Sequence, residues 1–318
     1  MDGPDQGSVP GESRLEQASA IRPHSWRNAL PLTDAEPVAA LPGFSEIADR
    51  FDLCFCDVWG VVHNGVAAFP DAVDALVRMR ERGTSVVLMT NAPRPRDLIA
   101  RQLDGFGVPP AAWDAIVTSG DVCRSLIEAR AGQPMFRLGP DRDLPLIAGL
   151  DAPETRADEA SYVLCTGLFD DETDTPATYA DLLEGFAARR LTMICANPDL
   201  VVERGGQIVP CAGSVALAYE EIGGSVIYAG KPHRPIYEMA LAIAEEKRGS
   251  AVARDRICAI GDAIRTDIAG AAGFGAAGIM VLAGIHAQDL MQASWEERHG
   301  WFGRQTHRPD YAIPHLVW

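Results

Sequence analysis

The sequence predicts a doubly wound α/β fold, in which helices cover both faces of a parallel sheet. From Phe51 onward, short apolar runs alternate with segments of helical periodicity, as strands alternate with helices in α/β proteins. Polar residues follow several of these runs directly, and open parallel sheets bind ligands outside the carboxyl ends of their strands. Because parallel strands need right-handed crossovers, we expect the connecting helices on both faces of the sheet.

The core strands and helices can be placed in order along the chain. In the helix predicted over 71–82, apolar residues recur on one side from Val73 to Met79, and Gly83 follows as an end signal. The same kind of pattern predicts the other core elements: strands over 51–57, 85–90, 115–118, 225–230, 256–260 and 278–282, and helices over 96–106, 121–131, 235–247 and from Thr266.

A second set of elements lies between Gly132 and Gly224. Apolar runs predict strands over 135–138, 162–165 and 191–195, and helical periods predict helices over 179–190 and 214–222. By pattern alone, these elements could extend the same sheet.

Four polar residues follow predicted core strands: Asp57, Thr90, Lys231 and Asp262. The first two are 33 residues apart and the last two 31 residues apart, so each gap fits one strand–helix unit of about 30 residues. The middle gap of 141 residues leaves room for an additional domain. We therefore predict a core over 41–131 and 225–318, interrupted by an inserted α/β cap domain over 132–224.

Residues 1–40 differ in composition from the rest, being rich in Pro, Gly, Ser and acidic residues. Such a segment buries little apolar surface, so we expect a flexible N-terminal tail. The alternative is an arm docked through the apolar groups of 21–32.

Charge and hydropathy exclude several classes of partner. The 318 residues carry a formal net charge of −16, and 47% of them are hydrophobic, as in a globular protein. A polyanion repels such a chain, so neither nucleic acid nor an anionic membrane surface is an expected partner. The longest uncharged run, Ala269–Ile285, is broken by five glycines and is shorter than the roughly 18 apolar residues of a membrane span.

The seven cysteines contain no C-x-x-C pair and mostly stand inside apolar, strand-like runs. This pattern predicts buried free thiols rather than a disulfide framework or a zinc site. The amino terminus has no apolar core after a basic start, as a secretory signal would have. Both observations favour a cytoplasmic location.

Lys231 stands out because the chain has 28 cationic residues and only two of them, Lys231 and Lys247, are lysines. Arginine presents a planar fork, whereas lysine presents a compact charge that fits beside a small anion and a carboxylate. Lys247 is explained by acidic neighbours near a helix end. We therefore expect a functional role for Lys231.

Together, the four strand-end residues suit phosphoryl transfer. Asp57 can act as a nucleophile, and Asp262 can share Mg²⁺ with it, because that ion prefers hard oxygen ligands. The Thr90 hydroxyl and the Lys231 ammonium can neutralise the phosphoryl oxygens. Taken singly, Asp57, Thr90 and Asp262 would equally suit strand ends, turns or helix caps.

At this point the chain resembles a known family. Its motifs are Asp57-Val-Trp-Gly-Val-Val-His-Asn-Gly65, Met89-Thr90-Asn91, Gly230-Lys231-Pro232 and Gly261-Asp262-Ala-Ile-Arg-Thr-Asp267. In this order they resemble the four motifs of the haloacid dehalogenase (HAD) superfamily, whose core is Rossmann-like. The cap position and Cys195-Ala-Asn-Pro-Asp199 are similar to class IIA, the NagD-like phosphatases, and the resemblance runs from about residue 44 to residue 316.

The resemblance implies a Mg²⁺-dependent phosphatase that hydrolyses a small phosphorylated metabolite through an aspartyl-phosphate. Asp57 would be the nucleophile, Thr90 and Asn91 would bind the phosphoryl group, and Lys231 would steady both. Asp57, Asp262 and the backbone carbonyl of Trp59 would hold Mg²⁺, with Asp267 in support. The cap would close over the site and select the substrate, and dimers through the cap are common in this class.

Trp59 departs from the family pattern. The family's phosphatases normally carry a second aspartate two residues after the nucleophile, as general acid and base, and an indole cannot exchange that proton near neutral pH. Losing such help typically costs about 10²–10⁴-fold in rate, and good leaving groups suffer least. His63 or Asp199 could take over this proton transfer. The alternatives are that His63 is a structural histidine and that Asp199 belongs to a turn.

Two other functions therefore stay open. The chain could be a catalytically weak or inactive phospho-ligand-binding protein on the same scaffold, as Trp59 suggests. It could also attack carbon, as the superfamily's dehalogenases do, which lack that aspartate as well. The Asp262 and Asp267 pair disfavours the second alternative, because attack on carbon there needs no Mg²⁺. The identity of the substrate is not readable from the chain.

Overall fold

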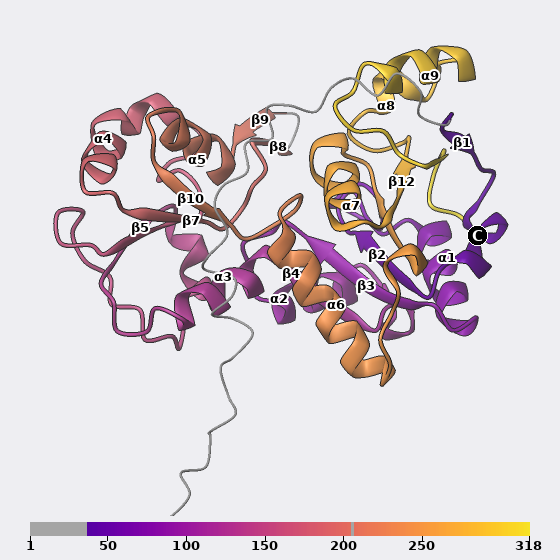
Figure 1. Cartoon of the computed structure of the whole chain (residues 1–318), viewed down its shortest axis with the longest axis horizontal. Helices are drawn as coiled ribbons and strands as arrows, with labels where there is room; N and C mark the ends of the chain where they lie inside the picture. The colour runs from indigo at the N-terminus through magenta and orange to yellow at the C-terminus, as the bar shows by residue number, and fades with distance from the viewer. Residues whose placement is uncertain (1–36, 205–206) are drawn as a thin grey trace, which may run out of the picture. The chain divides into compact units, whose positions relative to one another are not determined.

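A computed structural model describes residues 37–204 and 207–318. Its larger sheet has seven strands in the order β1-β13-β12-β11-β2-β3-β4, and every neighbouring pair is parallel (Figure 1). The predicted doubly wound α/β fold is confirmed. The strands are β1 (Ala39–Ala40), β2 (Leu53–Asp57), β3 (Ser85–Thr90), β4 (Ala115–Thr118), β11 (Ile257–Gly261), β12 (Ala277–Val281) and β13 (Tyr311–Ile313).

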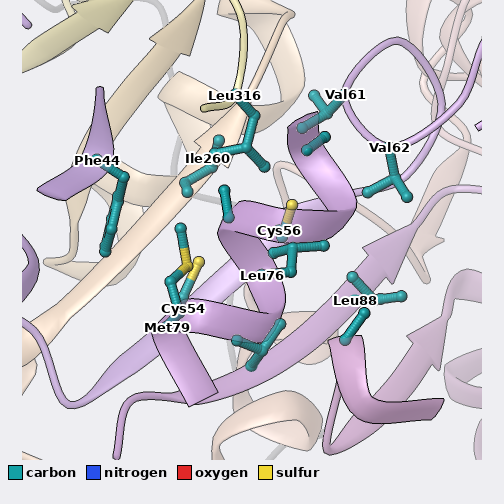
Figure 2. Packing of buried hydrophobic residues seen from close by; sticks show 14 of the residues in the cluster. Phe44, Cys54, Cys56, Val61, Val62, Leu76, Met79, Leu88, Ile260 and Leu316 are labelled. Carbon is teal, nitrogen blue, oxygen red and sulfur yellow. The ribbon is translucent and has the colours of Figure 1, made fainter. Parts of the chain in front are cut away.

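Alternate side chains of β2 point to opposite faces of this sheet, where different helices bury them. Cys54 and Cys56 pack in one apolar cluster with α1 (Pro70–Glu81) and α2 (Arg96–Gly105), as Figure 2 shows for part of it. Leu53 and Phe55 belong to a second cluster on the other face. Its helices are α3 (Ser119–Glu128), α6 (Arg234–Arg248) and α7 (Ala269–Phe274). Burial on both faces explains why β2 reads as an unbroken apolar run.

A smaller sheet has four parallel strands in the order β10-β7-β6-β5. Val163, Cys165 and Met193 pack from one face of it against α4 and α5. The structure does not otherwise test the division of the chain into a core and a cap, which remains a prediction. The elements are β5 (Met135–Leu138), β6 (Tyr162–Cys165), β7 (Thr192–Cys195), β10 (Ser225–Tyr228), α4 (Ala180–Ala188), α5 (Ala212–Glu221) and the hairpin β8 (Val201–Arg204) with β9 (Gln207–Pro210).

We assigned the strand expected over 225–230 to the core, but it belongs to the smaller sheet. As β10 it pairs with β7 at the edge of the smaller sheet, and its side chains are exposed or half-buried. A short apolar run gives no information about which distant strand it will pair with, so the sequence could not assign its sheet. Lys231 therefore follows a strand of the smaller sheet.

The two sheets share one apolar cluster. Tyr162, Leu164 and Ile194 of the smaller sheet belong to the same cluster as Leu53 and Phe55 of the larger one. Residues of α3 are part of this cluster, so α3 packs between the sheets. The contact between the two sheets is therefore apolar where α3 packs.

The end of the range predicted as a tail, residues 38–40, is part of the fold. Val38 is buried, and β1 pairs with β13 at the edge of the larger sheet, because an edge strand leaves backbone groups free to pair. Residues 1–36, and with them the alternative arm over 21–32, lie outside the described residues.

The carboxyl-terminal segment packs over Val38 with two helices that the sequence did not predict, α8 (Ala287–Leu290) and α9 (Trp295–Gly303). The helix expected from Thr266 begins instead with a π-helical turn, Ile264–Ile268, before α7. The short 3₁₀ helices are Phe44–Glu46, Ala48–Arg50, Pro110–Ala112, Asp141–Leu146, Pro176–Tyr179 and Arg254–Arg256.

The predicted state of the cysteines is confirmed. All seven cysteines are buried free thiols, as predicted. Among the helices in the described part of the chain, none is both long and apolar enough to cross a membrane.

Candidate active site

The site lies where the connections of the larger sheet change direction. The chain winds from β2 through β3 to β4 on one side and from β11 through β12 to β13 on the other. In open α/β sheets a crevice forms outside the strand ends at such a switch point. Asp57 ends β2, Thr90 ends β3 and Asp262 follows β11, so three of the predicted residues are brought to one edge.

Lys231 reaches this edge from the segment after β10. Its Nζ donates to Asp57 Oδ1 at 2.5 Å and to Asp267 Oδ1 at 2.7 Å, and its side chain is only 5% exposed. Burial disfavours the charged ammonium, but the carboxylates of Asp267 and Asp57 outweigh that effect and raise the pKa of Lys231 well above its usual value. Lys231 is therefore a fixed positive charge beside Asp57.

Asp262 is held by tightly packed backbone. Its Oδ2 accepts the Ile285 N–H at 2.9 Å. A Cβ at Gly60, where φ is +82°, would lie 2.2 Å from the same oxygen, and one at Gly284 would lie 2.1 Å from the Asp262 Cβ. These glycines leave the space that the carboxylate occupies. Burial, and then the charge of Asp267, raise the pKa of Asp262 to about 7.

The acidic residues form a group that fits a divalent cation. Asp57, Asp262 and Asp267 are buried, and each offers a carboxylate oxygen within 4.8 Å of the others. Burial raises the pKa of Asp57 well above its usual range, although Lys231 opposes that shift. One ammonium balances only one of three carboxylates, and hard oxygen donors with excess negative charge suit Mg²⁺. Asp267 uses its other oxygen to accept the Ala263 N–H at 3.1 Å, so it is tied to the backbone as well as to Lys231.

Thr90 and Asn91 both lie buried at the end of β3, in different bonding states. The Thr90 Oγ1 accepts the Ala92 N–H at 3.2 Å, which leaves the hydroxyl hydrogen for another acceptor. The Asn91 Oδ1 accepts the Lys231 N–H at 2.7 Å. Its Nδ2 donates to the Lys231 carbonyl at 3.0 Å and to Asp199 Oδ1 at 2.9 Å.

The Asn91 amide therefore has both hydrogens and its oxygen engaged, and it has no donor left for a phosphoryl oxygen in this arrangement. A Cβ at Gly230 would lie 2.3 Å from Asn91 Oδ1, so glycine permits this close approach. We define this set as the Asn91 clasp: the side chain of Asn91, the backbone of Lys231 and the carboxylate of Asp199. It joins β3 to the segment that carries Lys231.

The clasp is supported by Ser119, which sequence reasoning did not identify. Its hydroxyl lies 2.6 Å from the Ala196 carbonyl, 2.8 Å from that of Asn91 and 3.0 Å from that of Ala92. The preceding Thr118 forms a capping box with Asp121 at the start of α3. That Thr-x-x-Asp pattern is a signal that could have located the helix start two residues before our prediction.

The residues considered as substitutes for the missing acid are engaged elsewhere. The His63 Nδ1 accepts the Gly65 N–H at 2.9 Å, and the ring packs 4.9 Å from that of Phe106. Burial lowers the pKa of His63, because it disfavours the charged imidazolium. Asp199 accepts from Asn91, and burial raises its pKa.

Trp59 itself lies at the surface and is 41% exposed. Its Nε1 faces Gly65, where an added Cβ would approach to 3.2 Å. The indole is thus outside the buried charged group, although its backbone lies between Asp57 and Gly60.

Comparison with known proteins agrees with this geometry. A family model described as haloacid dehalogenase-like hydrolase matches residues 54–151, and a HAD-hydrolase-like model matches residues 228–317. The chain is 30% identical over 275 residues to D-glycerol 3-phosphate phosphatase of Mycobacterium tuberculosis, covering 81% of this chain and 70% of that protein. It is 26% identical over 242 residues to the ribonucleotide monophosphatase NagD of Escherichia coli K12, covering 74% and 88%.

Among solved structures, a haloacid dehalogenase-like hydrolase from Brucella suis superimposes with a TM-score of 0.76 at 43% identity. The match covers 87% of this chain and all of that one. Together with the NagD match, it confirms the resemblance on which the sequence motifs converged. The chain belongs to the haloacid dehalogenase-like hydrolase family, on the NagD-like side of it.

Proposed function

We propose that this protein is a Mg²⁺-dependent phosphatase that hydrolyses a small phosphorylated metabolite through an aspartyl-phosphate on Asp57. The observation that carries the proposal is the 2.5 Å contact between Lys231 Nζ and Asp57 Oδ1 inside a buried group of three carboxylates. A carboxylate that is fixed by a cation at a sheet switch point is oriented to attack an anionic phosphorus centre.

In the first step a carboxylate oxygen of Asp57 attacks phosphorus, and the bond from phosphorus to the leaving oxygen breaks. Lys231 holds the nucleophile, and its charge stabilises the negative charge on the transferring group. The Thr90 hydroxyl donates its free hydrogen to a phosphoryl oxygen. Water then attacks phosphorus and loses a proton to solvent, the bond to Asp57 breaks with its electron pair returning to the carboxylate, and phosphate leaves.

Mg²⁺, held by Asp57, Asp262 and the Trp59 carbonyl with Asp267 in support, would supply further positive charge to the phosphoryl oxygens. We assign Asn91 a positioning role, because its amide is consumed in the clasp. It orients the backbone of Lys231 and so the ammonium that meets Asp57.

The substrate class and location are part of the proposal. D-glycerol 3-phosphate phosphatase and NagD act on small phosphomonoesters by name, which supports a substrate of that size. Seven buried free thiols suit a reducing compartment, and we place the protein in the cytoplasm. A homodimer through the cap remains a prediction, as does the absence of nucleic-acid and membrane partners.

The test is phosphate release from 4-nitrophenyl phosphate and a metabolite panel, with Mg²⁺ or with EDTA, beside Asp57→Asn. We expect Mg²⁺-dependent release that falls by at least about 10³-fold in the variant, because the nucleophile is lost. A folded wild-type protein that releases no phosphate would refute the proposal. Activity that survives EDTA would point to attack on carbon, which needs no Mg²⁺.

Trp59 favours a second candidate, a phospho-ligand-binding protein with negligible turnover. This alternative predicts tight binding of Mg²⁺ and a phosphorylated ligand without release of phosphate. Trp59→Asp separates the two functions: if only proton transfer is missing, the substitution raises turnover, whereas a pure binding site stays inactive.

A further inference from the structure

Three exposed apolar side chains belong to the loops next to Asp262. Trp59 is 41% exposed, Val66 82% and Ile285 61%. We call these three residues the apolar rim. They contrast with the neighbouring Asp57 and Asp262, which are 9% and 4% exposed.

Backbone geometry places the rim at the site. Gly60, next to Trp59, approaches Asp262 so closely that a Cβ there would lie 2.2 Å from its Oδ2. The Ile285 N–H donates to that same oxygen. Val66 follows Gly65, which faces the Trp59 Nε1. Trp59 and Ile285 therefore lie at or next to backbone that contacts Asp262. Val66 lies next to the glycine that contacts Trp59.

Trp59 stands where the family pattern has the aspartate that gives the leaving oxygen its proton. Lys231 is bound between Asp57 and Asp267, and Asp199 accepts from Asn91. His63 accepts the Gly65 N–H at Nδ1, so its ring hydrogen is on Nε2, and the ring packs on Phe106. The position two residues after the nucleophile presents an indole, which cannot protonate an alkoxide. Without an acid at this position, we expect the leaving group to depart as an anion.

From these two observations we infer that the site selects phosphate monoesters of acidic aromatic alcohols, with Trp59 as the residue that determines this specificity. The inference rests on the proposed function. In the step concerned, Asp57 forms its bond to phosphorus while the bond from phosphorus to the aryl oxygen breaks. The aryloxide leaves with the electron pair and takes its proton from solvent.

The indole and the apolar rim favour an aromatic group for a second reason. Offset or edge-to-face contact between aromatic rings, with exposed apolar surface removed from water, gains about threefold to tenfold in affinity. A flexible aliphatic group gains less from the same rim. The site therefore has two requirements, an acidic leaving group and an aromatic one, and substrates that have only one of these properties can measure them separately.

The experiment measures kcat/KM for substituted phenyl phosphates and for an alkyl phosphate, because this constant covers the steps through leaving-group departure. We expect a steep fall in log kcat/KM as the leaving-group pKa rises in the wild type. Trp59→Asp should make this dependence on leaving-group pKa shallower. We expect kcat/KM to rise by about 10²–10⁴-fold for the alkyl phosphate and by less than about tenfold for 4-nitrophenyl phosphate.

Two matched variants separate the requirements. Trp59→Asn removes the indole without supplying an acid, so the steep dependence should persist while the aromatic preference disappears. Trp59→Phe should keep both. Acetyl phosphate, whose leaving group is acidic but not aromatic, should react less efficiently than 4-nitrophenyl phosphate in the wild type and lose that disadvantage in Trp59→Asn.

Melting temperatures check that each variant is folded, which we expect at an exposed position. A shallow dependence in an active, Asp57-dependent wild type would overturn this inference and leave the proposed function standing. Equal effects of Trp59→Asn and Trp59→Asp on the slope would also overturn it. No turnover of any aryl phosphate by the folded wild type would refute the proposed function, and this inference with it.

Discussion

The loop after β2 separates two regions of opposite character within a few residues. One is the buried charge cluster, which we define as Asp57, Lys231, Asp262 and Asp267, all at most 9% exposed. The other is the apolar rim, whose members are between 41% and 82% exposed. Each member of the cluster is fixed by a specific hydrogen bond, whereas the rim side chains form none with the described part of the chain.

This difference suggests that the buried charge cluster carries out the reaction and that the apolar rim selects the substrate. Charges that are buried and mutually bonded cannot change without a large loss, because each would leave its partners uncompensated. Exposed apolar side chains can change at little cost to the fold. We therefore expect substitutions in the cluster to affect turnover and stability together. Rim substitutions that introduce no acid should affect substrate preference alone.

The largest effect is expected at Lys231. Lys231→Met should lower kcat by about 10²–10³-fold or more, because the fixed charge beside the transferring group is lost. Lys231→Arg should also lose at least about 10²-fold, since a planar fork does not fit a gap that places one nitrogen 2.5 Å and 2.7 Å from two carboxylates. Phosphate release under saturating substrate measures both.

Removing this charge leaves three buried carboxylates without their cation, so Lys231→Met should also destabilise the fold by about 3–5 kcal/mol. Chemical denaturation measures that loss, and Mg²⁺ should offset part of it. A Lys231→Arg enzyme within tenfold of the wild-type rate would contradict the view that compact charge is required here.

The next effect is a pH dependence carried by Asp262. Its pKa is raised from an ordinary 3.8 to about 7 in the folded protein. Between these values the folded chain binds more protons than the unfolded chain, so this residue makes stability fall as the pH rises from about 4 to about 7. In EDTA, the melting temperature should therefore decline over this range more steeply in the wild type than in Asp262→Asn.

The effect of Mg²⁺ on the melting temperature is a second test of Asp262. The ion binds the ionised carboxylates of the folded protein, so at pH 8 it should raise the melting temperature of the wild type by several degrees. The rise should be much smaller in Asp262→Asn. Identical pH slopes and identical Mg²⁺ responses in the two proteins would remove Asp262 from the metal site.

The buried half of this comparison was largely readable from the sequence. The strands Ser85–Thr90, Ala115–Thr118 and Met135–Leu138 match their predicted bounds, because short apolar runs between turn signals are a local property. Lys231 could be identified because lysine is otherwise nearly absent. Its nearness to Asp57 was expected from the strand-end positions of both residues, and the family resemblance implied it as well.

What could not be predicted depends on contacts between distant segments. The pairing of β10 with β7, and of β1 with β13, is decided by tertiary packing. The Asn91 clasp joins residues 140 positions apart, so nothing near Asn91 signals that its amide is consumed. The sequence showed that Trp59 replaces an acid, but its exposure beside two other apolar residues is visible only in the fold.

A smaller effect is expected at the clasp, which links the cluster to the segment after β10. Asn91→Ala leaves the buried Lys231 N–H without its acceptor, at a cost of about 1–3 kcal/mol in unfolding free energy. Because Lys231 loses its support but not its charge, kcat should fall by roughly tenfold. Denaturation curves and phosphate release measure the two losses.

Asp199→Ala is the matched control for the clasp, since it removes one partner of Asn91 and leaves both bonds to the Lys231 backbone. It should lower kcat less than Asn91→Ala does. The reverse order would show that Asp199 itself takes part in the reaction, and it would restore this residue as a candidate general acid.

The smallest effect is expected at Val66, the most exposed member of the apolar rim. Val66→Ser should leave kcat and the melting temperature nearly unchanged and raise KM for aryl phosphates by about threefold, because part of one small apolar side chain no longer covers the substrate. KM for acetyl phosphate should not change. Val73, half-buried on α1 and packed against the core cluster, offers a valine-to-serine control that should lower stability instead. A large fall in kcat for Val66→Ser would mean that the rim takes part in the chemistry, and the boundary between the two regions would have to be drawn elsewhere.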